Sequence, residues 1–147
     1  MPAMPATLPA FIEPLGTGVF AIDTGFVRPR FDAAYLVIHN GRAAFIDTGT
    51  NHGVPRLLAA LDALGVARDA VEYVIPTHVH LDHAGGAASL ARAFPVARRV
   101  ASGRALDALG PTERCVRGEH WTWDGVSFEW MPALLISTSI GPSSRST

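Results

Sequence analysis

The sequence has few of the residues that several common classes of protein require. It contains one cysteine, Cys115, which excludes an intramolecular disulfide and argues against a zinc site built from thiolates. The formal net charge is −1, so the chain lacks the basic excess that is typical of nucleic-acid binding. Charged residues make up 17% of the 147 residues and hydrophobic residues 48%, which favours a folded domain with a substantial core.

Long apolar runs and a basic amino-terminal segment are also absent. No stretch approaches the ~20 residues that a membrane-spanning helix needs. Residues 1–10 contain three prolines and no lysine or arginine, unlike a secretory signal peptide. We therefore expect a cytoplasmic protein without a membrane partner, and the single thiol is compatible with a reducing compartment.

The periodicity of the apolar residues predicts an α/β domain. Strands are expected over residues 18–23, 33–39, 42–47 and 71–75, with a tight hairpin at Asn40-Gly41 between the second and the third. Helical spacing predicts one helix that begins near Pro55 and ends at Gly65, and a shorter helix over residues 86–94. Shorter strands follow at residues 96–101, 115–116, 121–123 and 126–131. We expect an incomplete domain over residues 1–132 and a disordered tail over residues 133–147, where serine and threonine dominate.

The segment after the strand at residues 71–75 concentrates ligand-type side chains. Three histidines and one carboxylate fall within six positions, His78, His80, Asp82 and His83. In an extended or tightly turned segment, the imidazoles of His78 and His80 can converge on one cation, while Asp82 and His83 face an adjoining position. Nitrogen ligands with one carboxylate favour Zn²⁺, followed by iron or manganese. The cluster therefore predicts one or two metal ions, and a coincidental polar loop is the alternative.

At these residues the chain resembles the metallo-β-lactamase superfamily, whose signature is His-x-His-x-Asp-His after a buried strand. Asp47, within Phe45-Ile46-Asp47-Thr48-Gly49, is similar to the family's upstream Asp-Thr-Gly element. The resemblance implies a partial αββα sandwich of mixed β-sheets flanked by helices, in a zinc-dependent hydrolase. It also implies that Asp82 is both a ligand and a catalytic group, and that Asp47 orients the ligand loop by hydrogen bonds. A metal-activated hydroxide would act on a small-molecule ester, thioester, lactone, lactam or phosphodiester.

The downstream half departs from the family pattern. The later ligands of the family are not recognisable. His120 is the only histidine after the cluster, and a hairpin or surface residue explains it more simply than a ligand does. Asp107 and Asp124 are weak candidates for the bridging aspartate. From about residue 96, and in Trp121-Thr122-Trp123-Asp124-Gly125-Val126 above all, the chain resembles the related domain of bacterial DNA-uptake channel proteins. A truncation, a gene fusion or a reading-frame shift is therefore predicted. The alternative functions are a catalytically incomplete metal-binding remnant and a DNA-uptake-associated domain.

Two further expectations concern the surface of the protein. Arg28 and Arg30 could line a substrate entrance, and His52 could support the Asp47 loop, although solvated surface positions explain all three more simply. A chain this short leaves one edge of the sandwich open, which predicts self-association through that edge.

Overall fold

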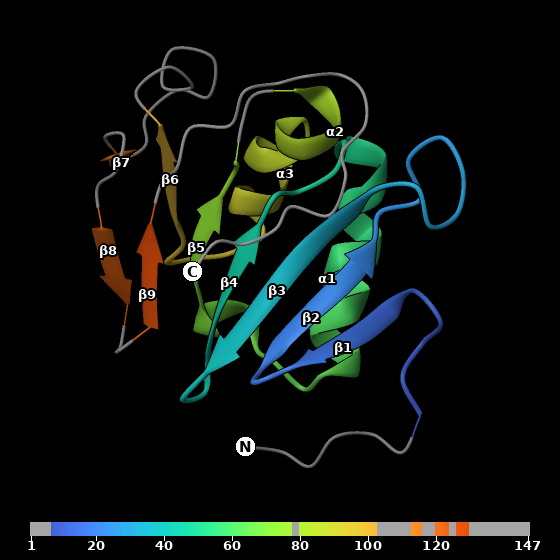
Figure 1. Ribbon diagram of the computed structural model, residues 1–147, viewed down its shortest axis with the longest axis horizontal. Helices are drawn as coiled ribbons and strands as arrows, with labels where there is room; N and C mark the ends of the chain where they lie inside the picture. Colours follow the sequence, from blue (N-terminus) through green and yellow to red (C-terminus); the bar gives the residue numbers. More distant parts are fainter. Residues whose placement is uncertain (1–6, 78–79, 103–112, 116–119, 124–125, 130–147) are drawn as a thin grey trace.

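The computed structural model describes residues 7–77, 80–102, 113–115, 120–123 and 126–129. Its strands and helices alternate along the chain (Figure 1). The strands are β1 (Ile12–Gly16), β2 (Val19–Asp23), β3 (Ala33–His39), β4 (Arg42–Ile46), β5 (Val71–Ile75), β6 (Arg98–Ser102), β7 (Glu113–Cys115), β8 (His120–Trp123) and β9 (Val126–Glu129). The helices are α1 (Val54–Ala63), α2 (Leu81–Ala84) and α3 (Ala87–Arg92), with 3-10 turns η1 (Asn51–Gly53) and η2 (Arg68–Ala70).

The main sheet has seven strands in the order β1-β2-β3-β4-β5-β6-β7. The first four strands form an antiparallel meander, and from β4 onward each neighbouring pair is parallel. Parallel neighbours require crossovers, and the chain crosses from β4 to β5 through α1, and from β5 to β6 through α2 and α3 (Figure 1). As a result, β4 and β5 both end at the edge of the sheet where the histidine cluster begins.

The predicted hairpin joins β3 to β4 at the opposite edge. Asn40 and Gly41 have positive φ values of 51° and 76°, as a two-residue hairpin turn requires, and His39 pairs with Arg42 across it. Helix α1 carries Pro55 in its first turn and is followed by Gly65 at φ 71°, which matches the predicted ends.

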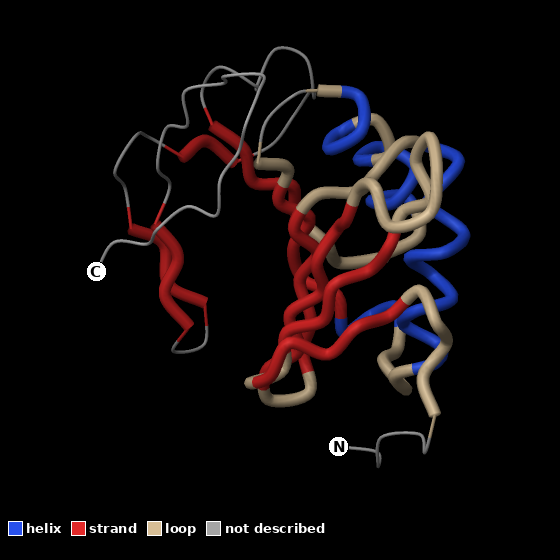
Figure 2. The backbone as a smooth tube through the Cα atoms, turned by 45° about the vertical axis from the view of Figure 1, so that its right-hand side comes forward, coloured by secondary structure: helices blue, strands red, loops and turns tan. Residues whose placement is uncertain are grey.

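The helices cover one face of the main sheet (Figure 2). The larger core lies between them and the sheet, where Phe45 of β4, Leu57 and Leu61 of α1 and Leu90 of α3 are fully buried. A smaller cluster of Val37, Ala44, Ile75 and Val100 is buried on the other face, which is the side on which the β8–β9 hairpin lies (Figure 2). Central strands buried on both faces are typical of a layered α/β domain.

The α/β architecture predicted from the sequence is confirmed, with local differences. Strand β1 was not predicted, and the helix expected over residues 86–94 is shorter, with a separate one-turn helix α2 preceding it. Asp82 and His83 therefore belong to a helix and not to an extended loop. The boundary at residues 132 and 133 lies outside the described residues. Within the described part of the chain, no helix is both long and apolar enough to cross a membrane.

Candidate metal centre

Two loops from adjacent parallel strands form the base of the site. The loop after β4 begins with Asp47, whose amide donates a hydrogen bond to the carbonyl of Ile75 at the end of β5, at 3.0 Å. The buried Thr48 donates its backbone amide to the carbonyl of His83 at 2.8 Å, and its hydroxyl accepts a hydrogen bond from the amide of Gly86 at 3.1 Å. These bonds fix the end of β4 against the segment that carries Asp82 and His83.

Gly86 permits this close approach. A Cβ at this position would lie 2.9 Å from Cγ2 of Val54, 3.0 Å from the carbonyl oxygen of Thr50 and 3.2 Å from that of Thr48. A larger residue would push the ligand segment away from the loop after β4. Close packing therefore requires a glycine at this position, directly before α3.

The carboxylate of Asp47 is buried beneath the ligand segment. It accepts hydrogen bonds from the amide of Thr77 at 2.7 Å and from its hydroxyl at 2.8 Å, both at Oδ1. Its other oxygen, Oδ2, lies 2.9 Å from Nδ1 of His83. Since a carboxylate only accepts hydrogen bonds, the proton of this pair resides on Nδ1 and the lone pair of the neutral imidazole is on Nε2.

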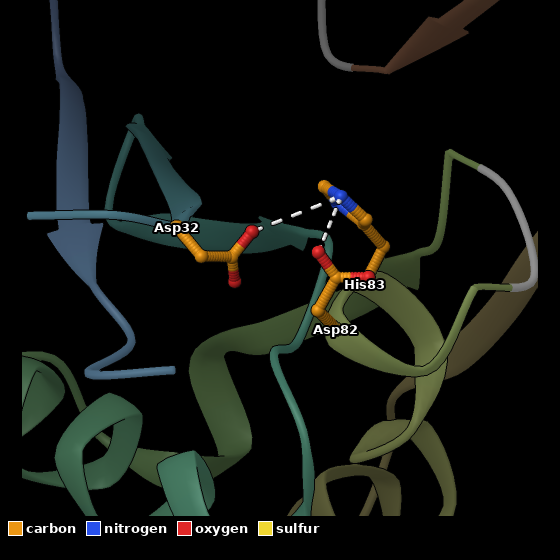
Figure 3. Close-up of side chains that lie close together, drawn as sticks. All are labelled: Asp32, Asp82 and His83. Carbon is orange, nitrogen blue, oxygen red and sulfur yellow. Dashed lines mark ion pairs between the residues drawn. The ribbon is translucent and has the colours of Figure 1, made fainter. Parts of the chain in front are cut away.

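Three side chains point toward one another in front of this base: Asp32, Asp82 and His83 (Figure 3). Nε2 of His83 lies 3.2 Å from Oδ2 of Asp82 and 3.7 Å from Oδ1 of Asp32. One ligand-type atom from each of the three residues lies within 4.8 Å of the other two. The donor set is one imidazole nitrogen and two carboxylate oxygens, which suits zinc, manganese or iron. The residues present therefore fit a divalent metal ion.

Three carboxylates, those of Asp47, Asp82 and Asp32, surround the imidazole of His83 and make the site electrostatically favourable for a cation. The hydrogen bond with Asp47 raises the pKa of the His83 imidazole above its ordinary value, against the opposing effect of burial, and the charges of Asp47, Asp82 and Asp32 add to the rise. Burial raises the pKa of the Asp32 carboxyl, which the hydrogen bond from Thr24 and the charge of His83 oppose, and the charges of Asp82 and Asp47 raise it further. Three carboxylates around one imidazole leave an excess of negative charge, which a divalent cation would offset.

Among the other ligands that the sequence predicts, only His80 has a side chain within the described part of the structure. His80 is exposed and immediately precedes α2. His120 is the first residue of β8, where it pairs with Glu129. His78, Asp107 and Asp124 lie outside the described residues, as does the side chain of His120. The assignment of His78 and His80 as ligands remains a prediction.

Sequence reasoning missed Asp32, which occupies the end of the loop between β2 and β3. It is an ordinary acidic residue before a buried strand and belongs to no motif. The available signal was topological: because β3 and β4 form a hairpin, the start of β3 lies at the same edge of the sheet as the end of β4. A carboxylate at the start of β3 therefore lies near the loop that Asp47 begins.

The loop before Asp32 is held by a second carboxylate, Asp23. Its Oδ1 accepts a hydrogen bond from the amide of Gly25 and its Oδ2 one from the amide of Arg30, both at 2.9 Å. Burial alone would raise the pKa of Asp23, but these two hydrogen bonds and the charges of Arg56 and Arg30 outweigh it, so that its pKa is lowered. A carboxyl group with a lowered pKa in the folded state stabilises the fold only while it is ionised.

We expect Asp23→Asn to remove an acid-sensitive part of the stability. In the parent, this contribution is complete above the ordinary aspartate pKa of about 4 and is lost as the pH falls through the lowered folded-state pKa. The free energies of unfolding of parent and variant should therefore differ at neutral pH and converge in acid. Urea unfolding measured at a series of pH values tests this. Curves that remain parallel down to the acid limit would contradict it.

Comparisons with known proteins relate the sequence and the fold of this chain to one superfamily. Residues 27–136 match the family model of the metallo-beta-lactamase superfamily. A metallo-beta-lactamase from Cronobacter sakazakii superimposes with a TM-score of 0.65 at 25% identity, covering 81% of this chain and 52% of that one. BJP-1, a subclass B3 metallo-beta-lactamase of Bradyrhizobium japonicum, gives a TM-score of 0.68 at 18% identity over 82% of this chain and 51% of that one, which shows the fold alone.

The curated relatives are longer proteins. Hydroxyacylglutathione hydrolase of Acidiphilium cryptum is 39% identical over 75 residues, which are 51% of this chain and 27% of that protein. Recombination protein 2 of Haemophilus influenzae is 30% identical over 98 residues, which are 65% of this chain and 12% of that protein. The chain thus spans less than a third of either relative. The family model nevertheless covers most of it, including the centre around His83, and the chain belongs to the metallo-beta-lactamase superfamily.

Proposed function

We propose that this chain carries the centre of a metal-dependent hydrolase that acts on acyl substrates, with zinc as the first ion and thioesters as the first substrate class. The observation that carries the proposal is the convergence of Nε2 of His83 and Oδ2 of Asp82 at 3.2 Å, with Nδ1 of His83 held by Asp47 at 2.9 Å. A metal-binding histidine is usually supported by a hydrogen bond that its second ring nitrogen donates to a carboxylate.

Each residue of the centre has a definite task in this proposal. Asp47 keeps the proton on Nδ1 and so presents the lone pair of Nε2 to the ion. Asp82 would help to hold the ion through a carboxylate oxygen, and its carboxylate would orient a water molecule by accepting a hydrogen bond from it. A bound divalent ion supplies Lewis acidity and lowers the pKa of water into the neutral range. His78 and His80 would contribute the adjoining position that their spacing predicts.

A neighbouring cavity supports a small-molecule substrate. It has a volume of about 550 Å³, within the roughly 300–1,000 Å³ range of ligand pockets. Phe26, Val27 and Leu81 give it an apolar side, and Asn51, His52 and Arg56 give it a polar side. Thr24, which hydrogen-bonds to Asp32, and Leu81, which directly precedes Asp82, both line this cavity, so it lies beside the centre. His52 is exposed, as the simpler interpretation of its sequence position predicted, and it lines this cavity.

The names of the relatives favour thioesters among the acyl substrates. Two hydroxyacylglutathione hydrolases, from Acidiphilium cryptum and from Cupriavidus taiwanensis, are each 39% identical to the chain over the aligned residues. A DNA-uptake-associated role is the second candidate, and the match to Recombination protein 2 supports it. The formal net charge of −1 counts against that candidate for this chain alone.

Metal removal tests the proposal directly. The purified chain is expected to contain about one or two equivalents of metal by elemental analysis, and to hydrolyse a hydroxyacylglutathione thioester. Dialysis against a chelator should abolish turnover, and added Zn²⁺ should restore it. Assays with a chromogenic β-lactam, a lactone and a phosphodiester then rank the substrate classes.

Two variants serve as controls for that experiment. His83→Ala removes the imidazole of the centre, and Asp62→Asn removes one carboxylate at an exposed position of α1 that pairs only with the surface Arg68 in the described structure. The first is expected to lose metal and turnover, and the second to retain both. A chain that binds less than one equivalent and turns over none of the four substrates is the incomplete remnant, and the proposal is then wrong.

A further inference from the structure

We propose that Asp32 is a direct ligand of the metal ion, as the third protein donor beside Asp82 and His83. This inference rests on the proposed function, because it assigns a residue to the same metal centre. Asp32 lies far upstream of the histidine cluster and belongs to neither of the two sequence elements that resemble the family. Its role follows from its position, its orientation and its burial.

The loop between β2 and β3 holds the Asp32 carboxylate in one orientation. The hydroxyl of Thr24 donates a hydrogen bond to Oδ2 of Asp32 at 2.7 Å, and the amide of Thr24 donates to the carbonyl of Asp32 at 3.0 Å. Thr24 is itself buried. With Oδ2 occupied by Thr24, the second oxygen, Oδ1, faces His83 (Figure 3).

The distance between His83 and Asp32 fits a metal site better than a hydrogen bond. In a tetrahedral zinc site with bonds of about 2.0–2.1 Å, neighbouring donor atoms lie about 3.3–3.4 Å apart. Nε2 of His83 lies 3.2 Å from Oδ2 of Asp82 and 3.7 Å from Oδ1 of Asp32, on either side of that value. The longer distance exceeds the normal range of an N–H···O hydrogen bond. One ion between the three donors satisfies both contacts at once.

Burial makes the position of Asp32 costly unless a cation compensates it. The Asp32 side chain is only 6% exposed, whereas those of Asp82 and His83 are 27% and 25% exposed. A buried carboxylate needs a partner of opposite charge or several hydrogen bonds. In the described structure, Oδ2 of Asp32 accepts a hydrogen bond from the Thr24 hydroxyl. The partner of Oδ1 there is Nε2 of His83, at 3.7 Å. Asp82 and His83 remain open enough to solvent for an ion to enter.

Metal affinity measured on matched variants tests this assignment. Asp32→Asn keeps the size of the side chain and removes the anionic ligand, and Asp62→Asn removes the same charge from an exposed position outside the centre. Affinity for Zn²⁺ is measured by competition with a chromophoric chelator at one pH and ionic strength. We expect Asp32→Asn to weaken binding by about 100-fold, the upper end of what outer supporting residues cost, and Asp62→Asn to leave binding unchanged. Circular dichroism shows whether each variant is folded.

A cobalt experiment separates a ligand from a residue that only orients His83. Asp32→Cys is prepared in a Cys115→Ser background, so that it carries one thiol, and is loaded with Co²⁺. If residue 32 coordinates the ion, a near-ultraviolet thiolate-to-cobalt absorption band appears in this variant and is absent from the Cys115→Ser parent. A thiolate is a strong ligand for such ions, so coordination at this position would be retained.

The outcomes distinguish the two proposals. A parent chain that binds neither Zn²⁺ nor Co²⁺ overturns both the metal-dependent function and the role of Asp32. A parent that binds metal, together with a folded Asp32→Asn variant of equal affinity and an Asp32→Cys variant without the band, overturns the assignment of Asp32 and leaves the function standing. Weakened binding together with the cobalt band establishes Asp32 as a ligand.

Discussion

Replacing Asp47 with asparagine is expected to weaken metal binding by about 10- to 100-fold while the fold is retained. The amide of Thr77 donates to Oδ1, so the oxygen of the new side chain must take that position. Its NH₂ group then replaces Oδ2 and donates to Nδ1 of His83, where Oδ2 of Asp47 now lies at 2.9 Å. The imidazole must carry its proton on Nε2, which can no longer bind an ion.

Asparagine is also the substitution that the backbone tolerates best. Asp47 has a φ of 65°, a conformation in which asparagine is enriched and alanine is strained. Chelator competition measures the affinity, and the change in unfolding free energy should be small beside that of Asp47→Ala. An Asp47→Asn variant that binds metal as tightly as the parent would show that the ion does not depend on this tautomer of His83.

Phe45→Ala is expected to destabilise the fold by about 3–5 kcal/mol, a large part of the roughly 5–15 kcal/mol that a domain typically has. Phe45 is fully buried in the middle of the larger core and stacks on Phe94 with ring centroids 5.7 Å apart. Its removal leaves a cavity between β4 and the segment after α3. Because Asp47 begins the loop directly after this strand, the loss also loosens the base of the metal centre.

The matched control is Phe31→Ala, which deletes the same side chain at a position that is 48% exposed. Phe31 contacts Phe26 and Arg28 on the surface of the loop between β2 and β3, and its loss should cost about 1 kcal/mol or less. Urea unfolding of the three proteins gives the comparison. Equal losses in both variants would mean that the core around Phe45 can close over the cavity.

The sequence predicts those parts of the fold that depend on local patterns. The strand at residues 33–39, the hairpin at Asn40-Gly41 and the helix that begins at Val54 each carry a strong periodic or turn signal, and each is found. Strand β1 carries no such signal, because Ile12 is its only buried residue and Pro14 interrupts it. It is an edge strand that depends on pairing with β2, and tertiary context decides its existence.

The metal centre, like the fold, can be predicted from the sequence only in part. Asp82 and His83 are evident because ligand-type residues are concentrated in the sequence, and the structure brings their side chains together. Asp32 is not evident, because its relevance arises only when the β3–β4 hairpin returns the chain and Thr24 fixes the carboxylate. A sequence motif identifies ligand residues that are neighbours in the chain. A ligand from a distant loop can be identified only once the folded structure is known.

The β3–β4 hairpin has one more consequence, for handling the protein in the laboratory. Its turn at Asn40-Gly41 lies at the end of β4 opposite to Asp47, and no heavy atom lies within 4 Å of the position that a Cβ at Gly41 would occupy. Exposed loop tips of this kind accept insertions and linkers better than other positions. A fluorophore or a surface tether attached there would therefore lie at the opposite end of these strands from the metal centre.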